Sequence, residues 1–145
     1  MSAYIDASAL IAVLMREPAS EAVKRQLDAE PSEPIISSLC RGECSAAIAG
    51  LVPMSRKTEA EAIALLSALD EWIETSAVMA DIRDTDITEA SRIVRRFDLK
   101  LRLPDAIHVA TARRMNVSLV TLDHRMALAA RALGVACINP AETSA

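Results

Sequence analysis

The sequence predicts an α/β protein with a mostly parallel central sheet that helices cover on both faces. Short apolar runs alternate with longer stretches of helical periodicity along the chain, and most prolines fall between these stretches. A helix after each strand returns the chain to start the next strand in the same direction, so this alternation predicts parallel pairing. The 145 residues match the usual size of one compact domain, and we expect a single domain over residues 1–145.

In the first half of the chain, prolines and serines mark the boundaries of the expected elements. Pro31 and Pro34 predict a turn. Ser37 and Ser38 are suited to cap the helix that follows, and Pro53 ends it. The expected elements are a strand at residues 1–5, helices at 7–15 and 19–30, a strand at 35–36, a helix that runs to residue 50 and an amphipathic helix at 58–73.

The second half contains one ambiguous segment between otherwise clear elements. Residues 75–85 have no clear periodicity, although a third strand fits there. Pro104 favours a helix start, and Gly134 is a natural C-terminal cap. The expected elements are a helix at 87–97, a connection at 98–103, a helix from 104, a strand at 118–121, a helix at 123–133 and a last strand at 135–138.

The charge of the chain limits the ways in which it could bind nucleic acid. A formal charge of −4 and a pI near 5.2 argue against binding by bulk electrostatics, so any nucleic acid must be held locally. One stretch is densely basic, and a solvated helix face explains it as well as an RNA-binding rim does. Its members are Arg92, Arg95, Arg96, Lys100 and Arg102.

The apolar segments and the cysteines indicate a cytoplasmic protein without a membrane span. The apolar run at residues 9–15 is much too short to cross a bilayer, and no basic segment precedes it. Cys40, Cys44 and Cys137 are odd in number, which favours reduced thiols in the core over a disulfide framework. Structural zinc sites favour close cysteine pairs that flank turns, whereas Cys40 and Cys44 lie one helical turn apart, so zinc is not expected.

Three aspartates lie at the predicted starts of helices. Asp6 and Asp123 each follow a strand, and the carboxyl ends of parallel strands are where open sheets bind ligands. Asp105 falls in the first turn of its helix, where a negative charge interacts favourably with the helix dipole. Taken alone, each aspartate is better explained by these local roles in starting a helix.

Glu43 is not explained by capping, because it lies inside a predicted helix. Its neighbours at helical spacing are small or apolar, namely Leu39, Ala46, Ala47 and Gly50. An unpaired carboxylate on an apolar face would be costly to desolvate or would be forced to take up a proton. Glu43 therefore needs a cation, a hydrogen-bond network or a position at the edge of this face.

These acids repel one another if they converge, so a shared site would need positive partners. Hard divalent cations such as Mg²⁺ or Mn²⁺ are the usual partners of carboxylate oxygens. A carboxylate site with no obligatory His or Cys suggests phosphoryl transfer, in which two ions about 3.5–4 Å apart activate water and stabilise the leaving oxygen. The four acids are Asp6, Glu43, Asp105 and Asp123.

Four segments resemble, in order and spacing, the motifs of PIN-domain proteins and, more closely, the VapC toxins of bacterial toxin–antitoxin pairs. They are YIDAS at residues 4–8, the helix around Glu43, LPDAIHVATA at residues 103–112 and LVTLD at residues 119–123. The resemblance spans almost the whole chain, although residues 75–86 match poorly. It implies a three-layer α/β/α fold, Mg²⁺- or Mn²⁺-dependent endoribonuclease activity on structured RNA, a homodimer and a VapB-type antitoxin partner.

The resemblance also implies roles for individual residues. The four acids would be catalytic residues and metal ligands, and the hydroxyls of Ser8 and Thr121 would support them. His108 follows Asp105 by three residues and is better explained as a hydrogen-bonded structural histidine than as a contact to RNA. We expect His124 to be a surface residue near the rim of the pocket.

Three other functions compete with this interpretation. A phosphatase of the haloacid dehalogenase type would carry a second Asp two residues after Asp6, where this chain has Ser8. A receiver domain would carry adjacent acids early and a Lys after a late strand, and neither is in the expected place. A PIN-fold binding module without catalysis stays open, although all four acids are present.

Overall fold

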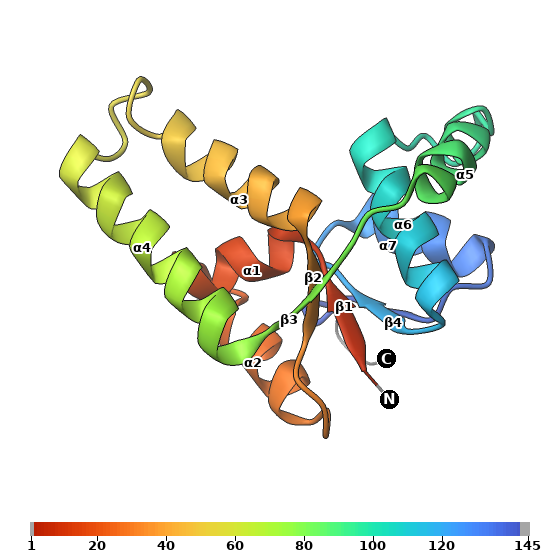
Figure 1. Cartoon of the computed structure of the whole chain (residues 1–145), viewed down its shortest axis with the longest axis horizontal. Helices are drawn as coiled ribbons and strands as arrows, with labels where there is room; N and C mark the ends of the chain where they lie inside the picture. Colours follow the sequence, from red (N-terminus) through yellow and green to blue (C-terminus); the bar gives the residue numbers. More distant parts are fainter. Residues whose placement is uncertain (1, 143–145) are drawn as a thin grey trace.

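The computed structural model of the chain describes residues 2–142 and confirms the predicted α/β architecture (Figure 1). Within these residues, five parallel strands form one sheet: β1 (Ala3–Ile5), β2 (Ile35–Ser37), β3 (Val78–Ala80), β4 (Ser118–Val120) and β5 (Cys137–Ile138). The helices are α1 (Ala7–Leu14), α2 (Ser20–Asp28), α3 (Ser38–Gly50), α4 (Glu59–Ser76), α5 (Asp84–Val94), α6 (Leu103–Met115) and α7 (His124–Ala132). No helix in this part of the chain is long and apolar enough to cross a membrane.

The strand order, β3-β2-β1-β4-β5, places β1 at the centre of the sheet. The chain first extends the sheet to one side through β2 and β3, and then crosses over to add β4 and β5 on the other side. Ile5 lies opposite Val120, so β1 and β4 end at the same level. A reversal of strand order of this kind creates a crevice at the carboxyl ends of the two strands that flank it.

Two apolar cores, one on each face of the sheet, give the fold its three layers. Neighbouring strand residues point to opposite faces. Ala3, Ile5 and Val120 belong to the core formed with α1, α2, α3 and α4. Tyr4 and Leu119 belong to the core formed with α5, α6 and α7. Figure 1 shows the two groups of helices on either side of the sheet.

Local caps set several helix boundaries, and those at Ser37 and Gly134 were predicted. Ser37 Oγ accepts the N–H of Cys40 at 3.1 Å and so starts α3. Thr58 and Glu61 form a reciprocal capping box at the start of α4. Gly134 follows α7 with a φ of +77°, a left-handed conformation that suits glycine.

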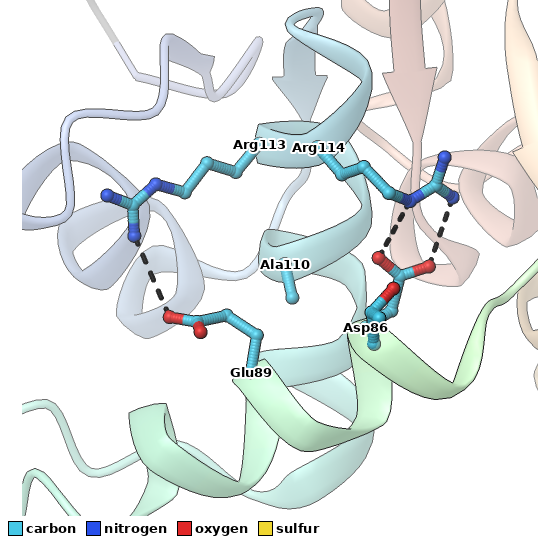
Figure 2. Close-up of a pocket in the computed structure, with 6 residues that line it drawn as sticks. Asp86, Glu89, Ala110, Arg113 and Arg114 are labelled. Atoms are coloured by element: carbon cyan, nitrogen blue, oxygen red, sulfur yellow. Dashed lines mark hydrogen bonds and ion pairs between the residues drawn. The ribbon is translucent and has the colours of Figure 1, made fainter.

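The helix predicted at residues 87–97 begins and ends three residues earlier, as α5. Asp86 explains its start, because the buried carboxylate accepts the N–H of Arg83 at 2.9 Å. The same carboxylate accepts two hydrogen bonds from Arg114 of α6, at 2.8 and 3.0 Å (Figure 2). Asp86 and Arg114 therefore fasten α5 to α6, the helix that carries Asp105 and His108.

Two other segments differ from, or complete, the predictions. The ambiguous residues 75–85 contain β3, which pairs with β2. The last strand covers only residues 137–138, because the N–H of Val135 donates to the carbonyl of Ala130 at 2.9 Å and closes the end of α7. The three cysteines are free, as expected, and Cys40 and Cys44 lie in the core.

Candidate active site

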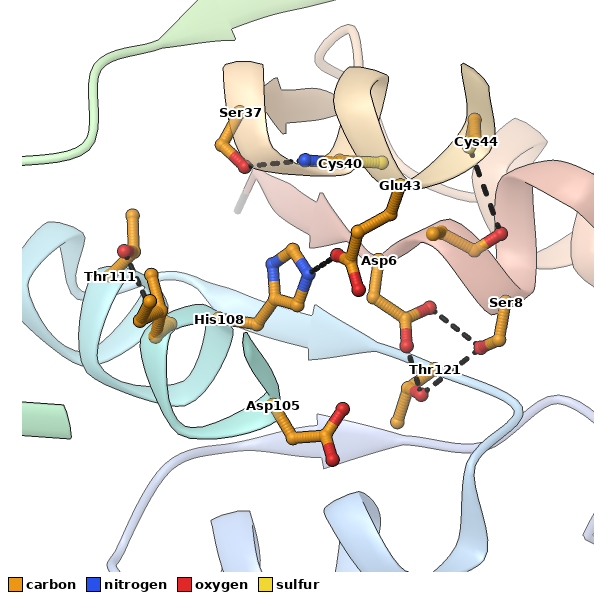
Figure 3. A network of polar contacts seen from close by, with 12 residues as sticks. Asp6, Ser8, Ser37, Cys40, Glu43, Cys44, Asp105, His108, Thr111 and Thr121 are labelled. Atoms are coloured by element: carbon orange, nitrogen blue, oxygen red, sulfur yellow. Dashed lines mark hydrogen bonds and ion pairs between the residues drawn. The ribbon is translucent and has the colours of Figure 1, made fainter. Parts of the chain in front are cut away.

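The candidate site lies at the crevice where the strand order reverses. Asp6 follows β1 directly, and Asp123 comes shortly after β4. Asp105 and His108 reach the same region from α6, and Glu43 reaches it from α3 (Figure 3). The predicted residues thus come from four segments that are far apart in the sequence.

Asp6 is almost completely buried at the end of β1 and has a partner on each carboxylate oxygen. Oδ1 accepts hydrogen bonds from the hydroxyl of Ser8 at 2.7 Å and from the N–H of Ala9 at 3.1 Å. Oδ2 accepts the hydroxyl of Thr121 at 2.6 Å (Figure 3). Asp6 therefore caps α1, as capping alone would predict, and also belongs to a hydroxyl network that capping does not explain.

Burial and hydrogen bonding act on the pKa of Asp6 in opposite directions. Burial raises it, whereas the hydrogen bonds from Thr121, Ser8 and Ala9 lower it. Burial has the larger effect, so the pKa of Asp6 lies above its ordinary value. The ionised form of this carboxylate is thus incompletely compensated by its protein partners.

Ser8 and Thr121 connect Asp6 to the segment that carries Asp123. Ser8 Oγ accepts the N–H of Leu122 at 3.0 Å, and Thr121 Oγ1 accepts the N–H of Asp123 at 3.0 Å. Asp123 itself accepts the N–H of Met126 at 3.1 Å and caps α7. The two hydroxyls therefore fix the relative positions of two acids that follow neighbouring strands.

Glu43 occupies an edge position, which corrects one premise of the sequence analysis. The buried face of α3 is formed by Cys40, Cys44 and Ile48, whereas Ala46 and Ala47, predicted to lie on a buried face, are exposed. The Glu43 side chain is 31 % exposed, so it lies at the margin of the core and contacts water as well as protein. The carboxylate nevertheless has a buried partner, since Oε1 is hydrogen-bonded to Nε2 of His108 (Figure 3).

Asp105 has few compensating contacts for a carboxylate at its depth. It is 9 % exposed and lies in the first turn of α6. Burial raises its pKa; Arg102 lowers it, and the negative charges of Asp123 and Glu43 raise it further. The Arg102 guanidinium lies 3.6 Å away, but its side chain is 83 % exposed. The net pKa of Asp105 is raised, which is the behaviour expected of a carboxylate among other acids.

His108 is a hydrogen-bonded buried histidine, as the sequence analysis favoured. It is 1 % exposed, and its two ring nitrogens contact Glu43 and the hydroxyl of Tyr4, the latter at 2.6 Å. Tyr4 in turn donates to Ser37 Oγ at 2.8 Å. The roles of Tyr4 and Ser37 were not predicted, although the position of Tyr4 on a buried strand and the predicted capping role of Ser37 were the available signals.

The remaining candidate residues lie at the surface. His124 is exposed, as expected, and its Nδ1 lies 3.7 Å from a carboxylate oxygen of Glu142. In the basic stretch, Arg92 forms an ion pair with Glu89, and Arg96 forms one with Asp98. The member of this stretch that reaches the acids is Arg102, through its contact with Asp105.

The donor set fits a hard divalent cation in its chemistry. Among residues 2–142, no three His, Cys, Asp or Glu side chains are placed so that they could hold a metal ion as they stand. Hydroxyl and amide donors contact both oxygens of Asp6, and His108 contacts one oxygen of Glu43. Carboxylate oxygens are the ligands that Mg²⁺ and Mn²⁺ prefer, and the raised pKa of Asp105 indicates unmet negative charge.

Comparison with known proteins places the chain in a family. The family model for the PIN domain matches residues 3–132. Ribonuclease VapC46 from Mycobacterium tuberculosis is 34 % identical over 140 residues, which cover 94 % of this chain and 96 % of that protein.

Solved structures of the same fold include VapC20 from M. tuberculosis, with a TM-score of 0.68, 17 % identity and coverage of 88 % of this chain and 94 % of that one. VapBC2 from Rickettsia felis, bound to a promoter DNA fragment, matches with a TM-score of 0.71 and 16 % identity, covering 96 % of this chain and 98 % of that one. The structural matches show the fold, and the family model and the identity to VapC46 show the relationship. The chain belongs to the PIN-domain family, and within it to the VapC-type ribonuclease toxins.

Proposed function

We propose that this protein is a Mg²⁺- or Mn²⁺-dependent endoribonuclease that hydrolyses structured RNA, with its active site at the crevice between β1 and β4. The observation that carries the proposal is Asp105, a buried carboxylate whose pKa is raised by burial and by neighbouring acids. Arg102, the cation paired with it, is largely exposed and compensates it weakly. A divalent cation would supply the missing positive charge.

The four acids are proposed to hold the cation or cations, with distinct supports for each acid. Asp6 is positioned by Ser8 and Thr121, which leave its carboxylate fixed at the end of β1. His108 contacts Oε1 of Glu43, and Oε2 takes no part in that contact. Two bound ions would activate water and stabilise the leaving oxygen. The protein contributes the positions of the carboxylates and the negative charge that attracts the ions.

The reaction proposed is in-line attack of water on the phosphodiester, which leaves 5′-phosphate and 3′-hydroxyl ends. Attack by the ribose 2′-hydroxyl would require a pair of acid–base groups. The protein has two histidines, and His108 is buried while His124 is exposed and near Glu142. They are therefore poorly suited to work as a pair. Products with mainly 2′,3′-cyclic phosphate would contradict the mechanism.

A VapB-type antitoxin is the proposed protein partner, and a homodimer is the proposed assembly. The solved structures of the same fold include VapBC and FitAB complexes, and these support an antitoxin partner. A groove between α1, α2 and α4 is the proposed docking surface for one antitoxin segment. It lies toward the end of the sheet where β2 and β3 begin, so the basic side chain that reaches the acids would come from another part of the antitoxin. The groove is lined by Val13, Lys24, Leu27, Asp28, Pro34, Trp72 and Ser76.

A metal titration combined with an RNA cleavage assay tests the catalytic proposal. Purified protein is expected to bind Mn²⁺ and to cleave structured RNA in Mn²⁺ or Mg²⁺ but not in chelator. Asp105→Asn should lose both properties. Asp70→Asn is the matched control, because Asp70 is an exposed acid of α4 paired with Arg41 at 2.7 Å. Absence of metal binding and cleavage in the wild type would favour the alternative of a PIN-fold binding module.

A further inference from the structure

His108 occupies an unusual position for a purely structural residue, because it joins the buried core to the edge of the acidic site. It is 1 % exposed, whereas its partner Glu43 is 31 % exposed. A buried imidazole needs hydrogen-bond partners, but a half-exposed carboxylate can be solvated by water. The hydrogen bond with Glu43 therefore satisfies a buried nitrogen of His108, whereas Glu43 does not need it for solvation.

The contact restricts a side chain that would otherwise be free to move. Glu43 is a long side chain at the margin of α3, and among the described residues its recorded partner is His108 on α6. Only Oε1 takes part in this contact, so Oε2 stays available on the side of the other acids (Figure 3). A hydrogen-bonded carboxylate with one free oxygen is the usual form of a supported metal ligand.

We infer that His108 is a positioning residue, which holds Glu43 by one carboxylate oxygen so that the other oxygen can bind a divalent cation. This inference rests on the proposed function and extends it to a residue that does not itself touch the cation. The loss of outer contacts of this kind lowers metal affinity by about 10–100-fold in other metal sites.

Tyr4 and Ser37 fix the imidazole from the opposite side. The Tyr4 hydroxyl lies 2.6 Å from Nδ1 of His108 and donates to Ser37 Oγ at 2.8 Å. Ser37 is held in turn by the N–H of Cys40 at 3.1 Å, in the first turn of α3. The chain of contacts therefore starts and ends on α3, and it passes through α6, β1 and the end of β2. This closed path fixes the distance between α3 and α6 at the site.

Two conservative substitutions of His108 separate positioning from packing. In His108→Gln, the amide nitrogen lies near the place of Nε2 and keeps a donor for Glu43. In His108→Asn, the shorter amide lies near the place of Nδ1, so it keeps the contact with Tyr4 but does not reach Glu43. The positioning role predicts Mn²⁺ affinity close to wild type for Gln and about 10–100-fold weaker for Asn. A packing role predicts no such difference.

Two more variants complete the design. Tyr4→Phe keeps the ring, whose centroid lies 5.6 Å from that of His108, but removes the hydroxyl that fixes the imidazole. We expect a loss of Mn²⁺ affinity smaller than in His108→Asn. Thr111→Val is the matched control, since it removes a buried hydroxyl of α6 that donates to the carbonyl of Ile107 at 2.8 Å, within its own helix. Its Mn²⁺ affinity should equal that of wild type.

A metal-free measurement checks the contact itself. The chain has two histidines, so the ¹⁵N spectrum of histidine-labelled protein contains two imidazoles. The ring N–H of buried His108 should exchange slowly with solvent, and its signal should shift in Glu43→Gln but not in Thr111→Val. An unshifted signal in Glu43→Gln would overturn the inference, because it would show that the two side chains are not in contact.

The binding data distinguish the inference from the proposed function. Calorimetric Mn²⁺ titrations are run on each variant, and melting in chelator confirms that each is folded. Equal affinities for wild type, Gln and Asn would overturn the inference while the proposed function stands. A wild type that neither binds Mn²⁺ nor cleaves RNA would overturn the proposed function, and the positioning role with it. Weak binding by Asn with rescue by Gln supports the inference.

Discussion

Replacing Asp105 by Asn tests whether the acids form a cation site, because the sign of the stability change depends on metal. Asp105 caps no helix within the described chain, so the substitution does not remove a cap. Burial raises the pKa of this carboxyl; Arg102 lowers it, and Asp123 and Glu43 raise it further, so the net pKa is raised. The ionised form is therefore less favourable in the folded protein than in the unfolded chain.

The raised pKa of Asp105 determines the pH range in which this carboxylate destabilises the fold. Destabilisation by Asp105 begins as pH rises through its unfolded pKa of about 3.9 and is complete above its raised folded pKa. At neutral pH in chelator, Asp105→Asn removes the buried charge and should melt higher than wild type. The ion pair lost with Arg102 opposes this effect only weakly, because the Arg102 side chain is 83 % exposed.

Saturating Mn²⁺ should reverse the order of the two melting temperatures, so that Asp105→Asn melts below wild type. At about 100 times Kd, binding stabilises the native state by about 2.7 kcal/mol. A variant that binds about 100-fold more weakly gains only about 0.4 kcal/mol at the same concentration. The difference of about 2.3 kcal/mol corresponds to roughly 5–9 °C in Tm for a chain of this size.

Thermal melts followed by circular dichroism at neutral pH, in chelator and in Mn²⁺, measure both signs. Asp70→Asn serves as the control for loss of one negative charge at an exposed site and should follow wild type in both buffers. Melting curves of Asp105→Asn that lie on the same side of wild type in chelator and in Mn²⁺ would refute the reasoning. Retained ribonuclease activity in this variant would lead to the same conclusion.

Three further predictions concern other parts of the molecule. Thr121→Val removes the 2.6 Å hydrogen bond to Asp6, so it should raise the pKa of Asp6 further and weaken Mn²⁺ binding by about 10–100-fold. An unchanged Mn²⁺ affinity in calorimetry would contradict this prediction. Arg114→Met leaves the buried Asp86 carboxylate without its main partner and should lower the free energy of unfolding by about 3 kcal/mol in urea titrations. Burial raises the pKa of Asp86, but its hydrogen bonds and the charge of Arg114 lower it to a net value below the ordinary one. The stabilisation that Asp86 gives to the fold should therefore be present above its unfolded pKa and be lost as the pH falls through its folded pKa. Trp72→Ala should weaken antitoxin binding by at least about 2 kcal/mol while RNA cleavage persists, and unchanged binding would show that the groove is not the antitoxin site.

The elements that were predicted correctly are those whose boundaries depend on local chemistry. Ser37, Thr58 and Gly134 end or start helices through contacts with residues nearby in the sequence, so the sequence alone indicates them. The start of α5 was misplaced although Asp86 makes a local contact with the N–H of Arg83; the partner that holds this buried carboxylate in place is Arg114, which follows it by 28 residues. A tertiary contact of this kind leaves no periodic signal in the sequence.

In the candidate site, too, local features of the sequence were predicted better than contacts between distant segments. The place of Asp6 after a strand suggested either a cap or a site residue, and the structure shows hydrogen bonds to it from Ser8 and Thr121, the two hydroxyls that the resemblance indicated. Glu43 was assigned to a buried face that proved to be exposed at Ala46 and Ala47, although the hydrogen-bond partner and the edge position that the sequence analysis allowed for are both present. Burial on a helix depends on what packs against it, and small residues alone do not predict which face is covered.

Asp123 allows the two roles of a helix-start aspartate to be separated in one experiment. Its carboxylate accepts the N–H of Met126 at 3.1 Å and so caps α7, while its charge raises the pKa of Asp105. Serine caps helices about as well as aspartate, but it carries no charge, whereas alanine does neither. Asp123→Ser keeps a cap and removes a charge that repels Asp105, so it should be at least as stable as wild type in chelator. Asp123→Ala should be about 1 kcal/mol less stable than Asp123→Ser, because it lacks the cap.

Both variants should bind Mn²⁺ weakly and cleave little RNA if Asp123 belongs to the cation site. The informative comparison is the serine variant, because a fall in Mn²⁺ affinity without a fall in chelator stability cannot come from loss of the cap. Urea unfolding in chelator and calorimetry in Mn²⁺ provide the two measurements. If Asp123→Ser retains both Mn²⁺ affinity and cleavage, Asp123 is a helix cap only, and the cation site is formed by Asp6, Glu43 and Asp105.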